Sequence, residues 1–273
     1  MQFEGKTIVI TGASRGIGRS IALKLATAGA NIAILAKSTT ENPKLGGTIY
    51  SVADEINAMG GHALPLPCDI RHEEEITRAI KSTTGTFGHI DILINNASAI
   101  SLTNTEQTES KRFDLMHDIN VRGTFLVTKH AVPHMKQSAN AHILTLSPPL
   151  NLSPQWFTHH AAYTISKYNM TMMALAWAEE FKKYHIASNC LWPATTIATA
   201  AVQNLLGGDM LVQRSRKPEI VADAAYHIML QNAVECTGNT FIDEKVLVTA
   251  GVSNFDNYAI NPANPLQKDL FLD

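Results

Sequence analysis

Two kinds of apolar pattern alternate along this chain. Short runs typical of strands buried on both faces read KTIVIT, NIAILA, HALPLP, DILINN, AHILTL, IASNCLW and TFIDEKVLV. Between them lie stretches with apolar residues three or four positions apart, typical of helices, at residues 19–28, 52–59, 73–81, 113–136, 163–184 and 218–231. Because alternating strands and helices build βαβ units, this order predicts a doubly wound parallel α/β sheet with helices on both faces.

The alternation runs through the 273 residues without a repeat, a low-complexity segment or a linker, so a single domain over residues 1–273 is predicted. Two stretches break the rhythm. Residues 38–50 are rich in Thr, Gly, Asn and Pro, and residues 194–217 follow a predicted strand that leads into Pro193. Long connections at the carboxyl ends of strands commonly form binding loops or lids. We expect residues 194–217 to be a substrate loop and residues 252–273 to form a C-terminal tail.

The composition favours small molecules as partners. Hydrophobic residues make up 45% of the chain and charged residues 17%, which is ordinary for a globular fold. The formal net charge is -2 and the pI is near 6.6, so a surface for nucleic acid or anionic membrane has little electrostatic support. We therefore expect no nucleic-acid partner.

Neither the cysteines nor the histidines predict a metal site. Cys68, Cys190 and Cys236 are widely spread and form no C-x-x-C pair, which argues against zinc and against a disulfide framework. His159 and His160 are adjacent in a polar loop, where histidines are usually solvated or hydrogen-bonded without further function. The cysteine pattern suits a reducing compartment.

The N-terminal sequence MQFEGKTIVITG has no signal-peptide pattern and leads directly into a predicted strand. No apolar stretch approaches the ~18 residues that span a bilayer. We therefore expect a cytoplasmic protein with no membrane span.

A glycine-rich turn, TGASRGIGRS, joins the first predicted strand to the first helix. Gly12, Gly16 and Gly18 let the backbone approach a pyrophosphate, which the N–H groups and dipole of the helix start attract. A tight turn without a ligand would use the same glycines, but the position between strand and helix favours nucleotide binding. The cofactor-binding residues predicted here are Thr11, Gly12, Ser14, Arg15, Gly16, Ile17 and Gly18.

The residue after the second strand bears on the choice of cofactor. An acidic residue there would bind a ribose with free hydroxyls, whereas this chain has Lys37. Lys37 and Arg15 would attract a 2′-phosphate, which predicts NADP(H) over NAD(H). Two alternatives stay open: both cations are solvated surface groups, or Glu41 bends back into the ribose site.

The third and fourth strands end in further candidates. Asp69 and Ile70 fall where an adenine ring would meet a carboxylate and an apolar wall, although Asp69 could equally cap the next helix. Asn95, Asn96 and Ala97 would line the crevice at the strand ends, although paired asparagines also form ordinary turns.

The segment YTISK places Tyr163 and Lys167 four positions apart at the start of a predicted helix. This spacing brings both side chains to one face, one turn apart, so they can point into the same pocket. The same pair would also occur on a solvated helix surface. The other motifs of the chain therefore have to decide between a pocket and a surface position.

TGASRGIG, NNAS, the asparagine of HDINVRG and YTISK, in this order, resemble the short-chain dehydrogenase/reductase family. The resemblance covers most of the chain and implies a Rossmann-like fold, a nicotinamide cofactor and hydride exchange with a carbonyl or alcohol. The finer matches AILAKSTTENPKLGGTIY, INNASAISLTNT, ILTLSPPLNL and NFDNYAINPANPLQ resemble the hydroxysteroid dehydrogenase-like group. Members of that group can carry a sterol-carrier domain, which this chain is expected to be too short to contain.

The resemblance gives YTISK a chemical role. Tyr163 would deliver a proton to the substrate oxygen. The ammonium of Lys167, together with the positive charge of the oxidised nicotinamide, would lower the phenol pKa from its ordinary value near 10. Lys167 would also bond the nicotinamide ribose. Asn120 would support a water chain from Lys167, although an interior asparagine bonded to backbone fits the same position.

The catalytic serine of the family is the weaker assignment. Ser147 lies at the end of the fifth strand, but an alignment without gaps puts Pro148 in the serine's place. Ser153 could replace it, or the site could have no serine. The resemblance further implies that Pro193, Ile197 and Thr199 meet the nicotinamide carboxamide.

The substrate is expected to be a hydrophobic carbonyl or alcohol such as a lipid, steroid or fatty-acyl derivative. This expectation rests on apolar residues that could equally form plain core, namely Leu150, Leu152, Trp156, Phe157, Leu205, Leu206, Met210 and Leu211. Two other readings stay open: an NADP-binding regulator or scaffold that has lost turnover, and an enoyl reductase. Apolar helix faces, for example at Met172, usually pack on the protein's own sheet. The resemblance implies that such helices pair between subunits, so a homodimer or homotetramer is expected.

Overall fold

Seven parallel strands form one sheet in the computed structural model, which describes residues 1–273, and the order of strands is β3-β2-β1-β4-β5-β6-β7. The reversal of order between β1 and β4 makes the sheet doubly wound, which confirms the predicted fold class. The strands are β1 (Thr7–Thr11), β2 (Asn31–Ala36), β3 (His62–Pro67), β4 (Ile92–Asn95), β5 (Ala141–Leu146), β6 (Ile186–Trp192) and β7 (Thr240–Ile242).

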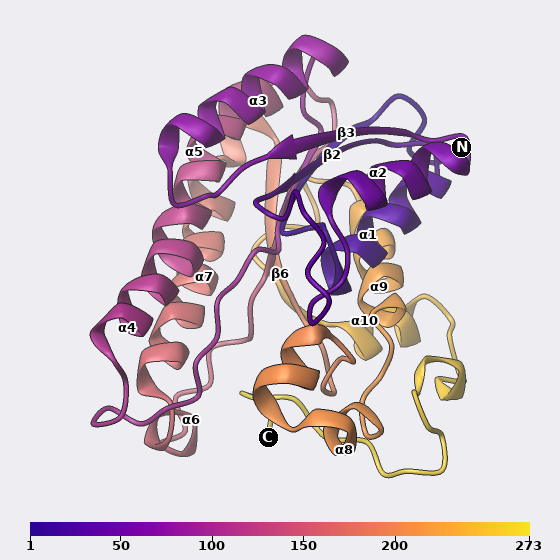
Figure 1. The fold of residues 1–273 in the computed structure, drawn as a ribbon. Coiled ribbons are helices and arrows are strands. Elements are labelled where there is room, and N and C mark those ends of the chain that lie inside the picture. Colours follow the sequence, from indigo (N-terminus) through magenta and orange to yellow (C-terminus); the bar gives the residue numbers. More distant parts are fainter.

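Helices lie on both sides of the sheet (Figure 1). On one side are α1 (Gly16–Thr27), α2 (Ile49–Ala58), α9 (Glu219–Met229) and α10 (Asp243–Thr249). On the other are α3 (Glu73–Phe87), α4 (Ser110–Met116), α5 (Thr124–Met135) and α7 (Ala161–Glu180). Because successive strand residues face opposite sides, Ile8 and Ile10 enter the core under α1 and α9, while Val9 enters the core under α3 and α5. No helix is long and apolar enough to cross a membrane.

The predicted helix over residues 113–136 is continuous but not uniform. A π-helical turn, His117–Gly123, joins α4 to α5, and Asn120 lies buried within it. Such widened turns occur frequently at functional sites, because they redirect one side chain without ending the helix. The remaining short helices are α6 (Gln155–Thr158), α8 (Gly208–Val212), the 3-10 turns Lys182–Tyr184 and Asp256–Tyr258, and the π-turn Val202–Leu206.

The strand predicted from TFIDEKVLV is correct only for its first three residues. The remainder is α10, because Asp243 ends the strand: its Oδ1 accepts hydrogen bonds from the N–H of Glu244 at 2.6 Å and of Ala194 at 2.8 Å. Helix α10 packs against α9, and Leu247 is fully buried there. Tertiary packing thus outweighs the strand preference of the two valines.

The two irregular stretches meet beyond the carboxyl ends of the strands. Residues 194–217, called the lid below, contain the π-turn Val202–Leu206 and α8, and Asn204 donates a hydrogen bond to Lys44 O in the loop before α2. Residues 252–273, the tail, return past the lid and end near it (Figure 1). The lid and the tail therefore lie at the edge of the sheet where ligands bind in open α/β folds.

Candidate active site

Two adjoining cavities, each of about 420 Å³, lie at the carboxyl ends of the strands. The glycine-turn cavity is bordered by the TGASRGIG turn, and the tyrosine cavity by Tyr163 and Lys167. The residues common to both linings are Ile17, Asn96, Ser98, Thr199 and Ala201. The shared wall makes one elongated cleft with a polar, glycine-rich half and a more apolar half.

The structure brings most of the predicted site residues to this cleft. Those at the glycine-turn cavity are Gly12, Ser14, Arg15, Gly16, Ile17, Gly18, Lys37, Asp69, Ile70, Asn96, Ala97 and Thr199. Those at the tyrosine cavity are Ile17, Asn96, Tyr163, Lys167, Pro193, Ile197 and Thr199. Four predicted residues, Thr11, Asn95, Asn120 and Ser147, line neither half.

Contacts between β1 and β4 shape the glycine-rich turn. Asn96 Nδ2 donates hydrogen bonds to Thr11 O at 2.9 Å and Gly12 O at 3.1 Å, while Thr11 Oγ1 accepts the N–H groups of Asn96 and Ala97 at 3.0 Å. Gly12 has a φ of +68°, and a Cβ on Gly18 would lie 2.5 Å from Asn96 Nδ2. Asn96 therefore holds the turn, and Thr11 acts from behind it. The bare backbone at the start of α1 fits a phosphate group.

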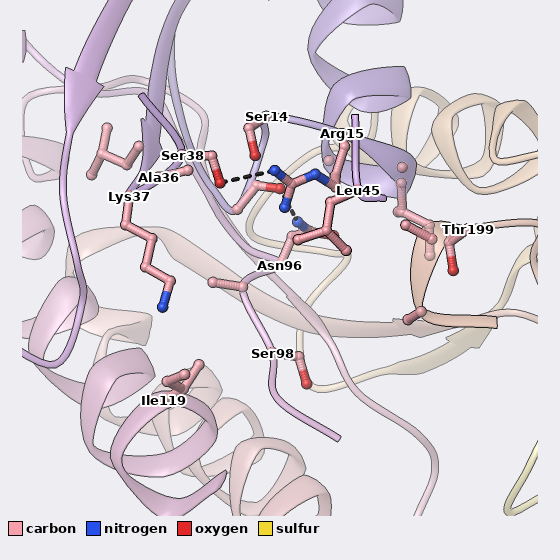
Figure 2. A pocket seen from close by; sticks show the side chains of 18 of the residues that line it. Ser14, Arg15, Ala36, Lys37, Ser38, Leu45, Asn96, Ser98, Ile119 and Thr199 are labelled. Atoms are coloured by element: carbon pink, nitrogen blue, oxygen red, sulfur yellow. Dashed lines mark hydrogen bonds between the residues drawn. The ribbon is translucent and has the colours of Figure 1, made fainter. Parts of the chain in front are cut away.

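Two cations border the far end of the glycine-turn cavity. Arg15 donates hydrogen bonds to Gly46 O at 2.8 Å, Ser38 Oγ at 2.9 Å and Gly47 O at 3.1 Å, and burial lowers the pKa of its guanidinium. Lys37 is exposed, and Figure 2 shows its amine extending away from the bonded pair of Arg15 and Ser38. Arg15 thus organises the loop before α2, and Lys37 is the free cation.

The carboxylate of Asp69 is paired within the protein. It accepts hydrogen bonds from Arg71 Nη2 at 2.6 Å and Nε at 3.0 Å, and the Arg71 hydrogen bonds hold its pKa below the ordinary value against the opposing effect of burial. Asp69 does not cap α3, because His72 occupies that position. Glu41, the alternative ribose partner, is exposed and lines neither half of the cleft.

Tyr163 and Lys167 lie one turn apart on α7, and both are buried, with 5% and 2% of their surfaces exposed. The ammonium of Lys167 donates a hydrogen bond to Leu146 O at 2.6 Å and lies 3.2 Å from Met170 Sδ. It also lies 5.2 Å from the centroid of the Trp192 ring. Both side chains of YTISK therefore reach the same cavity, as their spacing predicts.

Burial dominates the protonation of this pair. It raises the pKa of Tyr163 above its ordinary value of 10, and Asp269 raises it further. Burial lowers the pKa of Lys167 to about 7, against the attraction of Cys190 and Asp269. The predicted lowering of the Tyr163 pKa relies on the charges of Lys167 and of an oxidised nicotinamide together; in the protein alone, burial and Asp269 raise this pKa instead.

Asn120 is an interior asparagine bonded to backbone, which is the alternative to a role in a water chain. Its Oδ1 accepts the N–H of Ala99 at 2.8 Å, and its Nδ2 donates to Ala99 O at 2.9 Å and to Ser166 Oγ at 3.0 Å. Both amide protons are thus used inside the protein. The side chain ties the π-turn to the segment that leaves β4 and to α7.

Ser147 does not reach the cleft. It is fully buried, faces the Cys190 thiol, and its hydroxyl has no hydrogen-bond partner. Leu146 lines the tyrosine cavity, and the next side chain along an extended chain points the other way. Ser153 is also absent from the lining. The geometry therefore corrects the placement of Ser147 as a group facing substrate.

The walls of the tyrosine cavity are largely apolar. Of the predicted apolar residues, Leu206 and Leu211 of the lid line it, whereas Leu205 lines the glycine-turn cavity and Met210 is exposed. Trp156 and Phe157 pack instead in a small core with Tyr163, and Leu150 and Leu152 are exposed. Further apolar lining comes from Ile100, Leu102, Leu146, Trp192, Ile197, Val202 and Leu270.

The tail supplies four lining residues that sequence patterns did not single out, namely Gln267, Lys268, Asp269 and Leu270. Phe271, next along the chain, is 1% exposed. The one sequence feature that could have indicated a packed tail is the apolar run LFL directly after Asp269. The contacts of these residues are long-range, so the local periodicity of apolar residues does not predict them.

Comparisons with known proteins agree with this geometry. The family model described as short chain dehydrogenase matches residues 6–207. Human hydroxysteroid dehydrogenase-like protein 2 is 56% identical over 269 residues, which cover 98% of this chain and 64% of the length of that protein. The solved structure of a short chain dehydrogenase from Mycobacterium thermoresistibile is 51% identical, with a TM-score of 0.93 over 99% of this chain and 96% of that one. A metagenomic short-chain oxidoreductase in complex with NADP is 24% identical and resembles this chain in fold, with a TM-score of 0.73 over 89% of this chain and 98% of that one.

Proposed function

The chain belongs to the short-chain dehydrogenase family of oxidoreductases, and from this premise we propose that it exchanges hydride between NADP(H) and a hydrophobic carbonyl or alcohol. The observation that carries the proposal is the meeting of Tyr163 and Lys167 in the apolar half of a cleft whose other half is a glycine-rich cradle. Since the chain covers 64% of the length of its human relative, the proposal concerns this domain alone.

The cofactor would lie along the cleft and supply the hydride. Its phosphates fit the bare backbone at Gly12, Gly16 and Gly18. Lys37 and Arg15 border the ribose end, and no carboxylate lies there without a cationic partner, because Asp69 is held by Arg71. This charge arrangement supports NADP(H) over NAD(H).

Tyr163 would act as the general acid in the direction of reduction. Its raised pKa keeps the phenol protonated at neutral pH, so a proton is available for the substrate oxygen. Lys167 hydrogen-bonds Leu146 O and lies within the same cavity, where its remaining N–H groups can bond ribose hydroxyls. In the oxidation direction, the same phenol would have to lose its proton first.

The substrate pocket supports an apolar ligand. Leu206 and Leu211 from the lid face Ile100, Leu102 and Trp192 across the tyrosine cavity. A cavity of about 420 Å³ falls within the range of small-molecule sites, where a few polar groups orient a mostly apolar ligand. Lipid, steroid and fatty-acyl carbonyl compounds are the substrate class that this lining favours.

The burial of Ser147 favours a second candidate, an NADP-binding regulator with little turnover. The buried Tyr163 and Lys167 in the cleft favour the enzyme, because a pure binding protein has no need of a buried acid there. An enoyl reductase would use the same cofactor cradle. The three readings predict different substrates and different responses to loss of the phenol.

The decisive experiment follows NADPH oxidation by the purified protein with a panel of apolar ketones, aldehydes and enoyl thioesters. We expect turnover of a ketone or aldehyde and a loss of at least about 100-fold in kcat for Tyr163→Phe. Tyr50→Phe, which changes an exposed tyrosine on α2, is the matched control. Equal rates for wild type and Tyr163→Phe would reject the proposed role of Tyr163, and NADP binding without any turnover would support the regulator.

A further inference from the structure

The end of the tail is built into the wall of the tyrosine cavity. Phe271 is almost completely buried, and its ring centroid lies 5.3 Å from Tyr168, 5.9 Å from Trp192 and 6.2 Å from Tyr163. Its φ of +71° turns the chain sharply at this point. A phenylalanine in the left-handed region is strained, so the aromatic packing must hold it there.

Hydrogen bonds fix the backbone on both sides of this anchor. Trp192 Nε1 donates to Leu270 O at 3.0 Å, and the N–H of Thr196 donates to Gln267 O at 2.9 Å. The N–H of Asp269 donates to Ala194 O at 3.2 Å. These bonds join the tail to the last residue of β6 and to the segment that follows it, which borders the cleft. The position of residues 267–271 is therefore determined by the active-site wall.

Asp269 presents a carboxyl group to the cavity. Its Oδ1 accepts the N–H of its neighbour Leu270 at 2.7 Å, whereas Oδ2 has no hydrogen-bond partner in the protein. The charged and titratable groups that face it are Tyr163 and Lys167 on α7 and Asp243 at the start of α10. One oxygen of Asp269 is thus free to meet a ligand beside Tyr163.

The surroundings raise the pKa of this carboxyl group to near neutrality, so a large fraction of it carries a proton at pH 7. Burial raises the pKa of Asp269 to about 7, and Asp243 raises it further, while Lys167 acts in the opposite direction. Asp243 is itself fully buried behind the tail, next to an ion pair of Arg216 and Glu244. A carboxyl group kept neutral by its site can donate a hydrogen bond, as an oxyanion-hole acid does.

The active site lacks another donor in the expected place. A serine at the end of β5 was expected to polarise the substrate oxygen, but Ser147 points into the core. Thr196 is engaged with Ser215 through their hydroxyl groups at 2.8 Å. We propose that the carboxyl group of Asp269 hydrogen-bonds the substrate oxygen beside Tyr163 and acts as a further catalytic residue. The proposal rests on the proposed function, because it assigns a second group to the same oxygen.

The proposal predicts a specific response to substitution. Asp269→Ala removes the donor, so kcat for carbonyl reduction should fall about 100-fold, as for loss of one oxyanion-hole donor, while the KM for NADPH stays within about twofold. Asp269→Asn keeps an N–H donor and should retain activity within about tenfold of wild type. Wild-type kcat should fall as the pH rises through about 7, where Asp269 ionises. Asp269→Asn should lose that part of the fall and keep only the part due to Lys167, whose pKa is also about 7.

Controls separate this role from a structural one. Glu179→Gln makes the same acid-to-amide change at an exposed position and should leave kcat and the pH profile unchanged. Equal kcat for Asp269→Ala and wild type, or identical pH profiles of kcat for wild type and Asp269→Asn, would overturn the proposal. If Asp269→Ala fails to fold, Asp269→Asn and its pH profile decide alone.

A measurement without turnover distinguishes the two proposals. Carbon NMR of the folded protein, with Asp269→Asn to assign the signal, should show the Asp269 carboxyl titrating near pH 7. An ordinary value below about 5 in protein that binds NADPH would overturn the role of Asp269 whatever its activity. Absence of turnover, or full activity of Tyr163→Phe, would instead reject the proposed function.

Discussion

The ammonium of Lys167 donates a 2.6 Å hydrogen bond to the carbonyl oxygen of Leu146, the last residue of β5. This bond ties α7 to the sheet at the point where the cleft opens. It also holds a cation in a place where 2% of the lysine surface is exposed. The site therefore maintains a buried charge close to its titration point, which has consequences for stability as well as for chemistry.

The free energy of unfolding should rise with pH just above neutrality. The pKa of Lys167 is about 7 in the folded protein and 10.5 ordinarily, so between these values the unfolded chain holds a proton that the folded chain has lost. One such proton increases the free energy of unfolding by about 1 kcal/mol between pH 7.5 and 8.5. Urea denaturation at the two pH values measures this, and Lys167→Met should abolish the increase. Lys81→Met, at an exposed position, should keep it, and an unchanged increase in Lys167→Met would assign the effect to other groups.

Gly18→Ala should weaken NADP(H) binding at least about tenfold. The added Cβ would lie 2.5 Å from Asn96 Nδ2 and 2.7 Å from Gly12 O, so the cradle has to open to admit it. Calorimetric titration gives the affinity. Gly85→Ala is the matched control: no atom lies within 4 Å of its Cβ in α3, so it should bind normally and gain about 0.5–1 kcal/mol of stability. Normal NADP(H) affinity in Gly18→Ala would mean that the phosphates bind elsewhere.

Lys37→Ala should lower the affinity for NADP about tenfold and leave that for NAD nearly unchanged. Its ammonium is exposed at the cavity, so a charged hydrogen bond to the 2′-phosphate is what the substitution removes. Titration of both nucleotides into wild type and variant tests this. Lys44→Ala, which changes a nearby exposed lysine outside the cavity lining, should bind both normally. Tighter binding of NAD than of NADP by the wild type would overturn the cofactor proposal.

Asn120→Ala should destabilise the protein by about 3 kcal/mol. The substitution removes the partner of the part-buried N–H and C=O of Ala99 and one of the two hydrogen bonds of the Ser166 hydroxyl, and each such loss costs about 1–3 kcal/mol. Chemical denaturation measures the change. Asn57→Ala removes an exposed amide that accepts one bond of 3.2 Å and should cost far less. Equal costs for the two variants would show that the π-turn does not depend on Asn120.

Sequence patterns predicted what local periodicity controls. The strands and helices of the doubly wound sheet follow from the apolar runs and their periods, and the pairing of Tyr163 with Lys167 follows from helical geometry. Patterns failed where a distant contact decides. The side chain of Asp243 ends β7 inside an apparently continuous strand, and Ser147 faces the core because its neighbour Leu146 faces the cavity. Phe271 anchors the tail through aromatic neighbours far away in the sequence, which no local pattern records.

The exposed apolar face of α7 should join copies of this chain, as we propose for a homodimer or homotetramer. Met172 and Ile165 lie two turns apart on α7 with 57% and 45% of their surfaces exposed, and Phe125 on α5 is 48% exposed. Large apolar side chains left exposed on a helix face are typical of an interface. Met172→Glu would bury a charge at the contact, so light scattering after size-exclusion chromatography should show a smaller assembly than wild type. Met59→Glu makes the same change at a methionine that is 52% exposed, beside α2, and should leave the assembly intact. An identical mass for wild type and Met172→Glu would place any interface on another face.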